Sequence, residues 1–177
     1  MVVVVGLAGA AGLASADRPR VGRRARVFSL YDTRGTLRSL SHWAYRGPAK
    51  PRRPKKAVVL EFFRTDCKPC VKGLPRLAAL QRRYRGRPVQ VLMVALLEKD
   101  EGERKLRAFL KRHPVPFPVL IDAYGVAAKR YIRQGDGLKL PGLFLIDRDG
   151  VLRAREPGLL DAKGAERLHR RIDALLR

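Results

Sequence analysis

The fold of this chain is decided by a stretch that reads Ala57-Val58-Val59-Leu60-Glu61-Phe62-Phe63-Arg64-Thr65-Asp66-Cys67-Lys68-Pro69-Cys70. The near-continuous apolar run at its start is typical of a strand buried on both faces. A helical pattern follows from Cys67 to Tyr84. Cys67 and Cys70 are the only cysteines of the chain. Strand, short turn, C-x-x-C and helix is an arrangement in which two thiols can alternate with a disulfide.

The two cysteines occupy different places on the predicted helix, and this separates their expected roles. Cys67 lies at the helix N-terminus, where unpaired backbone N–H groups and the macrodipole favour a thiolate. Lys68 adds a cation beside it. Cys70 lies one turn inside, close enough to resolve a mixed disulfide. The sequence therefore predicts an exposed nucleophile at Cys67 and a buried resolving thiol at Cys70.

Other interpretations of the cysteine pair have less support. A zinc site needs two further ligands, and the chain offers only His42, His113 and His169, without paired spacing. A c-type haem site needs a histidine directly after the second cysteine, where Val71 stands. A pair of inert buried thiols stays open as an alternative to the redox pair. We predict no metal site.

Glu61 is the only charged residue in the buried run. A lone carboxylate there is unfavourable unless it is paired, protonated or used in chemistry. Because burial raises the pKa of a carboxyl group, Glu61 is a candidate for general acid–base work beside the thiols. The alternative is an ion pair with a nearby arginine, or access to solvent at the sheet edge.

The composition indicates one domain with a strongly basic surface. The chain has 177 residues, of which 46% are hydrophobic, and a formal net charge of +23. Such a charge attracts anionic lipid, acidic proteins or nucleic acid. Because no zinc finger, RNP-like segment or basic heptad array accompanies it, we expect no specific nucleic-acid binding. A solvated arginine-rich surface is the preferred interpretation.

The N-terminus indicates export to the periplasm. Residues 2–13 are apolar, and Ala14-Ser15-Ala16 has the small-x-small pattern of a cleavage site. The apolar run is short for a membrane span, which needs about 20 residues, so an uncleaved anchor is the second choice. The expected organisation is a signal peptide or short anchor at 1–16, a basic linker at 17–26 and one domain at 27–177.

Strands alternate with helices along the rest of the chain. Hairpins are expected at 27–40 and 143–155, the second around a turn in which Gly150 suits a left-handed or bulge position. Further strands are expected at 89–97 and 117–121, and helices from Asp100 to His113, at 123–131 and after Asp161. No internal repeat is apparent. This order predicts an α/β fold of three layers, with a central mixed sheet, an N-terminal β-hairpin and helices on both faces.

From about Val27 onward the chain resembles the thioredoxin superfamily, and within it the exported TlpA/ResA-like branch with an AhpC/TSA-type redoxin domain. Several motifs in the right order make the match specific. They are the Phe28-Ser29-Leu30 hairpin with its glycine, the strand before Cys67, the x-Pro pair between the cysteines, Pro75, the run 117–122, the run 140–150 and Gly158.

The resemblance implies a thiol–disulfide oxidoreductase, and most specifically a periplasmic reductase of protein disulfides that uses no cofactor. Clients would include cysteines of cytochrome c or of copper sites, and the electron donor would be membrane-bound. The basic surface adds anionic lipid or acidic protein as contacts. The resemblance also implies a cis peptide bond at Leu140–Pro141, facing the cysteines. Leu140 and Pro141, with Lys68 and Pro69, are expected to contact the client.

Three positions depart from the family pattern. Asp66 stands where a tryptophan usually precedes the first cysteine, and its charge opposes thiolate formation. Gly73 replaces an acidic residue that many members carry; Glu61, which by resemblance exchanges protons with Cys70, is the candidate to take its place. Gly142 replaces a frequent threonine after the cis-proline. These changes bear on substrate and redox poise, and leave the thiol pair intact.

Two other functions compete with disulfide exchange. A thiol peroxidase of the AhpC/TSA type carries Pro-x-x-x-Thr/Ser-x-x-Cys, but Leu60 and Arg64 stand at the positions that shape its peroxide pocket. A non-enzymatic metal chaperone or basic docking module would need Cys67 and Cys70 with a nearby histidine, or an activity that survives loss of both cysteines.

Overall fold

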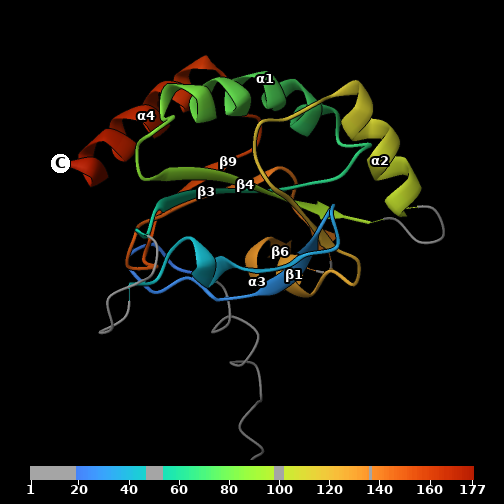
Figure 1. Cartoon of the computed structure of the whole chain (residues 1–177), viewed down its shortest axis with the longest axis horizontal. Helices are drawn as coiled ribbons and strands as arrows, with labels where there is room; N and C mark the ends of the chain where they lie inside the picture. The colour runs from blue at the N-terminus through green and yellow to red at the C-terminus, as the bar shows by residue number, and fades with distance from the viewer. Residues whose placement is uncertain (1–18, 47–53, 98–101, 136) are drawn as a thin grey trace, which may run out of the picture.

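A mixed seven-stranded sheet forms the centre of the molecule, as the computed structural model in Figure 1 shows. The structure describes residues 19–46, 54–97, 102–135 and 137–177. The strand order is β2-β1-β5-β4-β3-β8-β9, with β3, β4 and β5 parallel and the other neighbours antiparallel. The elements are β1 (Ser29–Asp32), β2 (Leu37–Ser39), η1 (Leu40–His42), β3 (Ala57–Phe63), α1 (Lys68–Arg83), β4 (Val89–Leu96), α2 (Gly102–Arg112), β5 (Val119–Asp122), α3 (Val126–Tyr131), β6 (Arg133–Gln134), β7 (Gly137–Leu138), β8 (Gly142–Ile146), β9 (Leu152–Pro157) and α4 (Ala162–Leu176).

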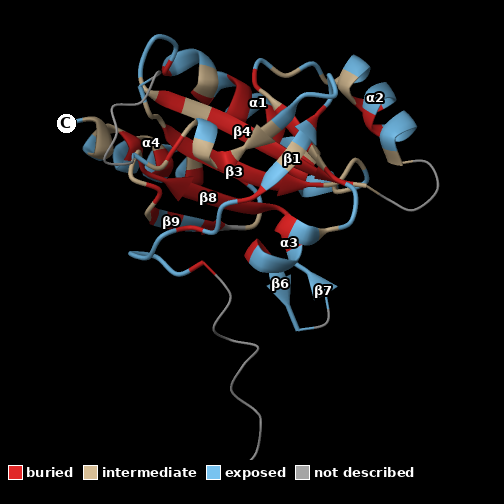
Figure 2. Ribbon diagram, turned by 60° about the horizontal axis from the view of Figure 1, so that its bottom comes forward, coloured by how far each residue is buried: buried red, intermediate tan, exposed pale blue. Residues whose placement is uncertain are grey.

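Helices cover both faces of this sheet. In Figure 1 α1, α2 and α4 lie over one face and α3 lies under the other. The side chains of β3 alternate accordingly: Val59 and Phe63 join the hydrophobic cluster under α1, α2 and α4, whereas Leu60 and Phe62 join the cluster around α3. Every residue of β3 is buried, and Figure 2 shows the same of the central strands. The predicted three-layer α/β fold with a mixed sheet and an N-terminal hairpin is confirmed.

Local sequence accounts for some of the element ends and not for others. Asp161 caps α4 by accepting a hydrogen bond from the Gly164 N–H at 2.7 Å, as expected of an N-cap carboxylate. α1 continues through Pro75, one of the motif residues that carry the family resemblance. The predicted helix start at Asp100 lies outside the described residues, and α2 begins at Gly102. The short β6–β7 hairpin was not predicted, because its strands have two residues each and are fully exposed.

The segment before β1 is attached to the β8–β9 hairpin. Gly22 donates its N–H to the Leu152 carbonyl, Ala25 donates to the Gly150 carbonyl, and Arg24 forms a bridge with Val151. Part of the stretch expected to be a linker therefore packs on the domain. Because β8 runs antiparallel to β3, this attachment lies at the start of β3, at the end of the sheet opposite Cys67.

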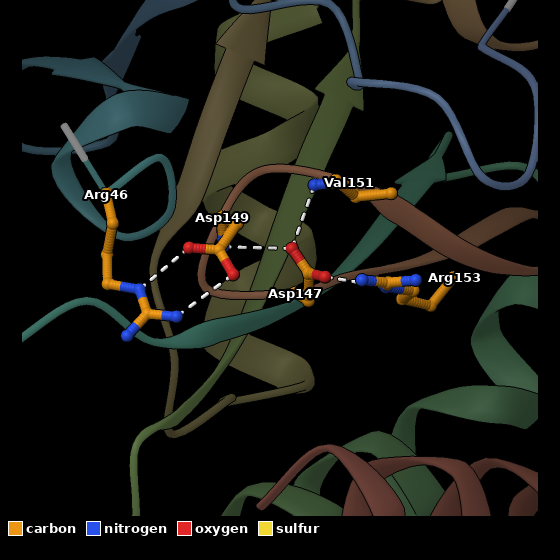
Figure 3. Close-up of polar contacts among 5 residues, drawn as sticks. All are labelled: Arg46, Asp147, Asp149, Val151 and Arg153. Atoms are coloured by element: carbon orange, nitrogen blue, oxygen red, sulfur yellow. Dashed lines mark hydrogen bonds and ion pairs between the residues drawn. The ribbon is translucent and has the colours of Figure 1, made fainter.

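Two hairpin turns share the pattern Asp-x-x-Gly-x-Leu-Arg, a short internal repeat where none was expected. In the β8–β9 turn, Asp147 Oδ1 accepts from the N–H groups of Asp149 and Val151, and Oδ2 accepts from Arg153 Nε (Figure 3). In the β1–β2 turn, Asp32 makes the same three contacts with the residues two, four and six positions later. The glycines have φ values of 74° and 80°, so the left-handed position predicted for Gly150 is confirmed.

Candidate active site

Cys67 and Cys70 form a disulfide at the N-terminus of α1, with their Cα atoms 5.3 Å apart. Cys67 is the N-cap residue, and its Sγ accepts a hydrogen bond from the Cys70 N–H at 3.3 Å. This donor and the helix dipole favour negative charge on the Cys67 sulfur after reduction. Cys67 is partly exposed, whereas Cys70 is 1% exposed and belongs to the cluster under α1. The geometry therefore offers a client only the first sulfur.

The residues around the disulfide are charged but partly neutralised. Arg64 and Asp66 form a two-pronged ion pair, in which the Arg64 Nε lies 2.9 Å from the Asp66 Oδ1. The negative charge expected to oppose a thiolate therefore has a cation beside it. Lys68 and Pro69, the first two residues of α1, are exposed next to Cys67.

The Leu140–Pro141 peptide bond is cis, as the resemblance implied. It immediately precedes β8, whose first residue, Gly142, pairs with Phe62 near the end of β3. Since β3 leads to Cys67, the cis-proline segment and the disulfide lie at the same end of the sheet. Leu140 also packs against the hydrophobic cluster that contains Cys70 and that Cys67 contacts.

Packing explains why glycine follows the cis-proline. A Cβ atom on Gly142 would lie 2.2 Å from Cγ2 of Ile132, a side chain that is completely buried. The threonine that is frequent in the family would therefore clash with Ile132 here. This pairing of a glycine with a distant isoleucine was not predictable from the local sequence.

Glu61 lies in the hydrophobic interior on the same face of the sheet as Cys70. Its neighbours across the sheet, Met93 and Leu143, belong to the cluster that contains Cys70. The Glu61 residue is 2% exposed, and its Oε1 has no hydrogen-bond partner in the described part of the chain. Burial raises the pKa of Glu61 to about 8. Among the residues that the structure describes, Glu61 has no ion pair, and its burial leaves it without the solvent access that the alternative interpretation required.

Two hollows lie along residues 138–142. The larger, of about 910 Å³, is lined by Leu138 and Leu140 and extends to Arg64, three positions before Cys67. The smaller, of about 260 Å³, is lined by Pro141, Gly142 and the edge strand β9. An extended segment lying along residues 138–142 would thus meet both.

The two positions that would form a peroxide pocket hold other chemistry. Leu60 is completely buried in the cluster around α3, and Arg64 is paired with Asp66. Neither supplies the proline ring or the hydroxyl group of that site. Within the described ranges, no three His, Cys, Asp or Glu side chains gather in a way that would hold a metal ion. The helices in those ranges are each too short or too polar to cross a membrane.

Comparisons with known proteins agree with this geometry. The AhpC/TSA family matches residues 21–155. The thiol-disulfide oxidoreductase ResA of Geobacillus kaustophilus is 32% identical over 149 residues, covering 83% of this chain and 75% of its own. ResA of Bacillus thuringiensis subsp. konkukian is 31% identical over 134 residues, with 76% and 68% covered.

A solved structure has the same architecture over nearly the whole chain. It is that of a proposed thiol:disulfide interchange protein DsbE from Chlorobium tepidum, 26% identical, with a TM-score of 0.73. The likeness covers 90% of this chain and 99% of that one. Together with the family match and the disulfide at the start of α1, this shows that the chain belongs to the AhpC/TSA family, as a thioredoxin-fold relative of the ResA thiol–disulfide oxidoreductases.

Proposed function

We propose that this thiol–disulfide oxidoreductase acts as a reductase of protein disulfides outside the cytoplasm. The observation that carries the proposal is the asymmetry of the disulfide: Cys67 is partly exposed at the N-cap of α1, and Cys70 is buried behind it. Such asymmetry suits a two-step exchange in which one thiol meets the client and the other completes the reaction.

In the reductive direction, the exchange takes two steps. The Cys67 thiolate attacks one sulfur of the client disulfide, forming a mixed disulfide and releasing the first client thiolate. The Cys70 thiolate then attacks the Cys67 sulfur, releases the second client thiol and leaves the Cys67–Cys70 disulfide. Two electrons pass to the client, and a dithiol donor must return them for the next cycle.

Glu61 is proposed to accept the proton of Cys70 in the second step. It lies on the Cys70 face of the sheet, and a pKa of about 8 is close to that of an ordinary thiol, so proton transfer between them needs little driving force. Because Gly73 supplies no carboxyl group, Glu61 would be the acid–base group of the buried thiol.

The client is proposed to lie beside the cis-proline. Leu140 and Pro141 stand at the disulfide end of the sheet, where the Leu140 backbone would pair with an extended client segment. Lys68 and Pro69, exposed next to Cys67, would contact the same segment. Cytochrome c or copper-site cysteines are the proposed clients, and a membrane-bound dithiol protein is the proposed donor.

Export is proposed from the sequence of residues 1–16, as a cleaved signal or a short anchor, with a periplasmic domain after it. The test is to express the chain with this segment in a bacterium and to determine the N-terminus of the product. A protein beginning at Asp17 supports cleavage, and full-length protein in the membrane fraction supports the anchor. Full-length protein in the cytoplasm would contradict export.

The exchange mechanism is tested by trapping. In the Cys70→Ser variant the mixed disulfide cannot be resolved, so we expect a client-bound complex on a non-reducing gel. Treating the sample with a reductant should release the client. The Cys67→Ser variant should form little of it, because Cys70 is buried. Equal trapping by both variants, or preferential alkylation of Cys70 in the reduced natural protein, would overturn the assignment of roles.

The role of Glu61 is tested by its amide isostere. Glu61→Gln keeps the shape but removes the proton acceptor, so the resolving step should slow roughly a hundredfold or more, since general base catalysis typically contributes about 10²- to 10⁴-fold. The first step, measured as mixed-disulfide formation by the Cys70→Ser variant with and without Glu61→Gln, should be unchanged. If overall turnover between pH 6 and pH 9 were unaffected, Glu61 would have no catalytic part.

A further inference from the structure

The smaller hollow beside Pro141 has the size expected of a pocket that takes a single side chain. Its volume is about 260 Å³, below the range of roughly 300–1,000 Å³ typical of pockets for separate small molecules. Pro141 and Gly142 form one wall, and β9, an edge strand of the sheet, forms another. A client segment lying along the cis-proline would therefore bring one of its own side chains to this hollow.

Two cations line the hollow, and neither has a carboxylate partner among the described residues. Lys139 and Arg155 are both exposed, and neither forms an ion pair with any residue in the described part of the chain. The guanidinium carbon of Arg155 lies 5.6 Å from the centre of the Phe144 ring. This stacking holds the Arg155 charge in place, so less conformational freedom is lost when an anion binds.

The carboxylate that also lines the hollow is already occupied. Glu156 is buried, its Oε2 lies 3.1 Å from Arg167 and its Oε1 lies 3.2 Å from Arg171. As the next residue along β9, Glu156 points to the face opposite Arg155, toward α4. Its charge is therefore neutralised by those two arginines, and the hollow keeps the positive charge of Lys139 and Arg155.

We propose that this hollow, lined by Pro141, Lys139 and Arg155, is a subsite for an Asp or Glu side chain of the client, close in sequence to the reacting cysteine. The inference rests on the proposed function, and it names a substrate class: disulfides flanked by acidic residues. Opposite charge at this position speeds encounter and orients the client segment along the cis-proline.

The experiment compares two disulfide-bonded peptides that differ only in carrying Glu or Gln beside the cysteines. The reduced natural protein should reduce the Glu peptide with a kcat/KM about three- to tenfold higher at low salt, as expected for one or two solvent-exposed ion pairs. The double variant Lys139→Gln/Arg155→Gln should lower the kcat/KM for the Glu peptide to that for the Gln peptide. It should leave the kcat/KM for the Gln peptide unchanged.

A matched control removes the same charges elsewhere. Lys111 and Arg112 are exposed in the last turn of α2, away from the hollow, and Lys111→Gln/Arg112→Gln should leave the preference intact. A charge reversal adds a gain of function: Lys139→Glu/Arg155→Glu should prefer a peptide with Lys in place of Glu.

The outcomes separate this inference from the function on which it rests. Equal rates with both peptides, or a preference that the α2 variant abolishes as strongly, would refute the subsite while the reductase stands. A protein that reduces neither peptide nor a small neutral disulfide would refute the proposed function itself.

Discussion

At the scale of single residues, Glu61 links stability to pH. Its ordinary pKa of 4.5 is raised to about 8 by burial, so the folded protein holds a proton that the unfolded chain has lost between these values. Stability is therefore greatest below about pH 4.5, as far as this group is concerned. It falls as pH rises, by about 1.4 kcal/mol per pH unit at most, and stops falling above the folded pKa.

The Glu61→Gln variant should lose this dependence. With the disulfide intact, so that no thiol titrates, the difference in unfolding free energy between variant and natural protein should grow in favour of the variant from pH 5 to pH 8. Chemical denaturation at a series of pH values measures it. A difference that is constant across this range would show that Glu61 titrates normally.

The stability of the protein also depends on the close approach of Ile132 to Gly142. Gly142→Ala should destabilise the protein by about 1–3 kcal/mol, because the new Cβ would overlap Cγ2 of Ile132. In an Ile132→Ala background that overlap is gone, so the same change should have a much smaller effect. A double-mutant cycle by urea denaturation measures the coupling. Strictly additive effects would mean that the backbone moves aside instead.

At the scale of elements, the two Asp-x-x-Gly-x-Leu-Arg turns fix the hairpins at both edges of the sheet. Each aspartate is buried and accepts two backbone N–H groups besides its arginine. In the β1–β2 turn burial disfavours the Asp32 charge, but the hydrogen bonds from Thr36, Arg38 and Arg34 outweigh it and lower the pKa of Asp32. The two carboxylates therefore stabilise the turn conformation, as the glycines do through their positive φ.

Asp147→Ala should destabilise the protein by about 2 kcal/mol, because two N–H groups and Arg153 lose their acceptor. The neighbouring Asp149 is the control, since its side chain makes an exposed ion pair with Arg46 (Figure 3). Asp149→Ala should therefore change stability by less than about 1 kcal/mol. Thermal unfolding of both variants measures the two losses of stability. Equal losses would show that the Asp147 hydrogen bonds stabilise the turn no more than the exposed ion pair does.

The elements also show how far the sequence could be interpreted. The apolar run 57–63 and the cysteine spacing predicted β3, α1 and their order, because burial on both faces and helix capping are local properties. The lack of space for a Cβ atom on Gly142 was not predictable, because it depends on how Ile132, at the end of α3, packs against β8. The hollow at Pro141 depends likewise on Lys139 and Arg155, which lie on separate segments and meet only in the folded chain.

At the scale of the whole molecule, the disulfide and the N-terminal segment lie at opposite ends of the sheet. Residues 22–25 bind the β8–β9 turn, whereas Cys67 follows the other end of β3. If residues 1–16 act as the proposed anchor, they join the domain at the end of the sheet opposite the cysteines, which suits the proposed reduction of clients from the aqueous side.

The net charge of +23 should act on the choice of client and leave the chemistry unchanged. The chemical step joins two sulfurs in contact, whereas attraction between the basic surface and an acidic client acts over distances that salt screens, with a Debye length of about 10 Å at 0.1 M. Reduction of a small neutral disulfide should therefore vary little between 20 mM and 500 mM salt. Reduction of an acidic protein client should weaken several-fold over the same range, mainly through slower association. Stopped-flow measurement of both reactions tests this separation, and equal salt dependence would show that the charge acts at the thiols themselves.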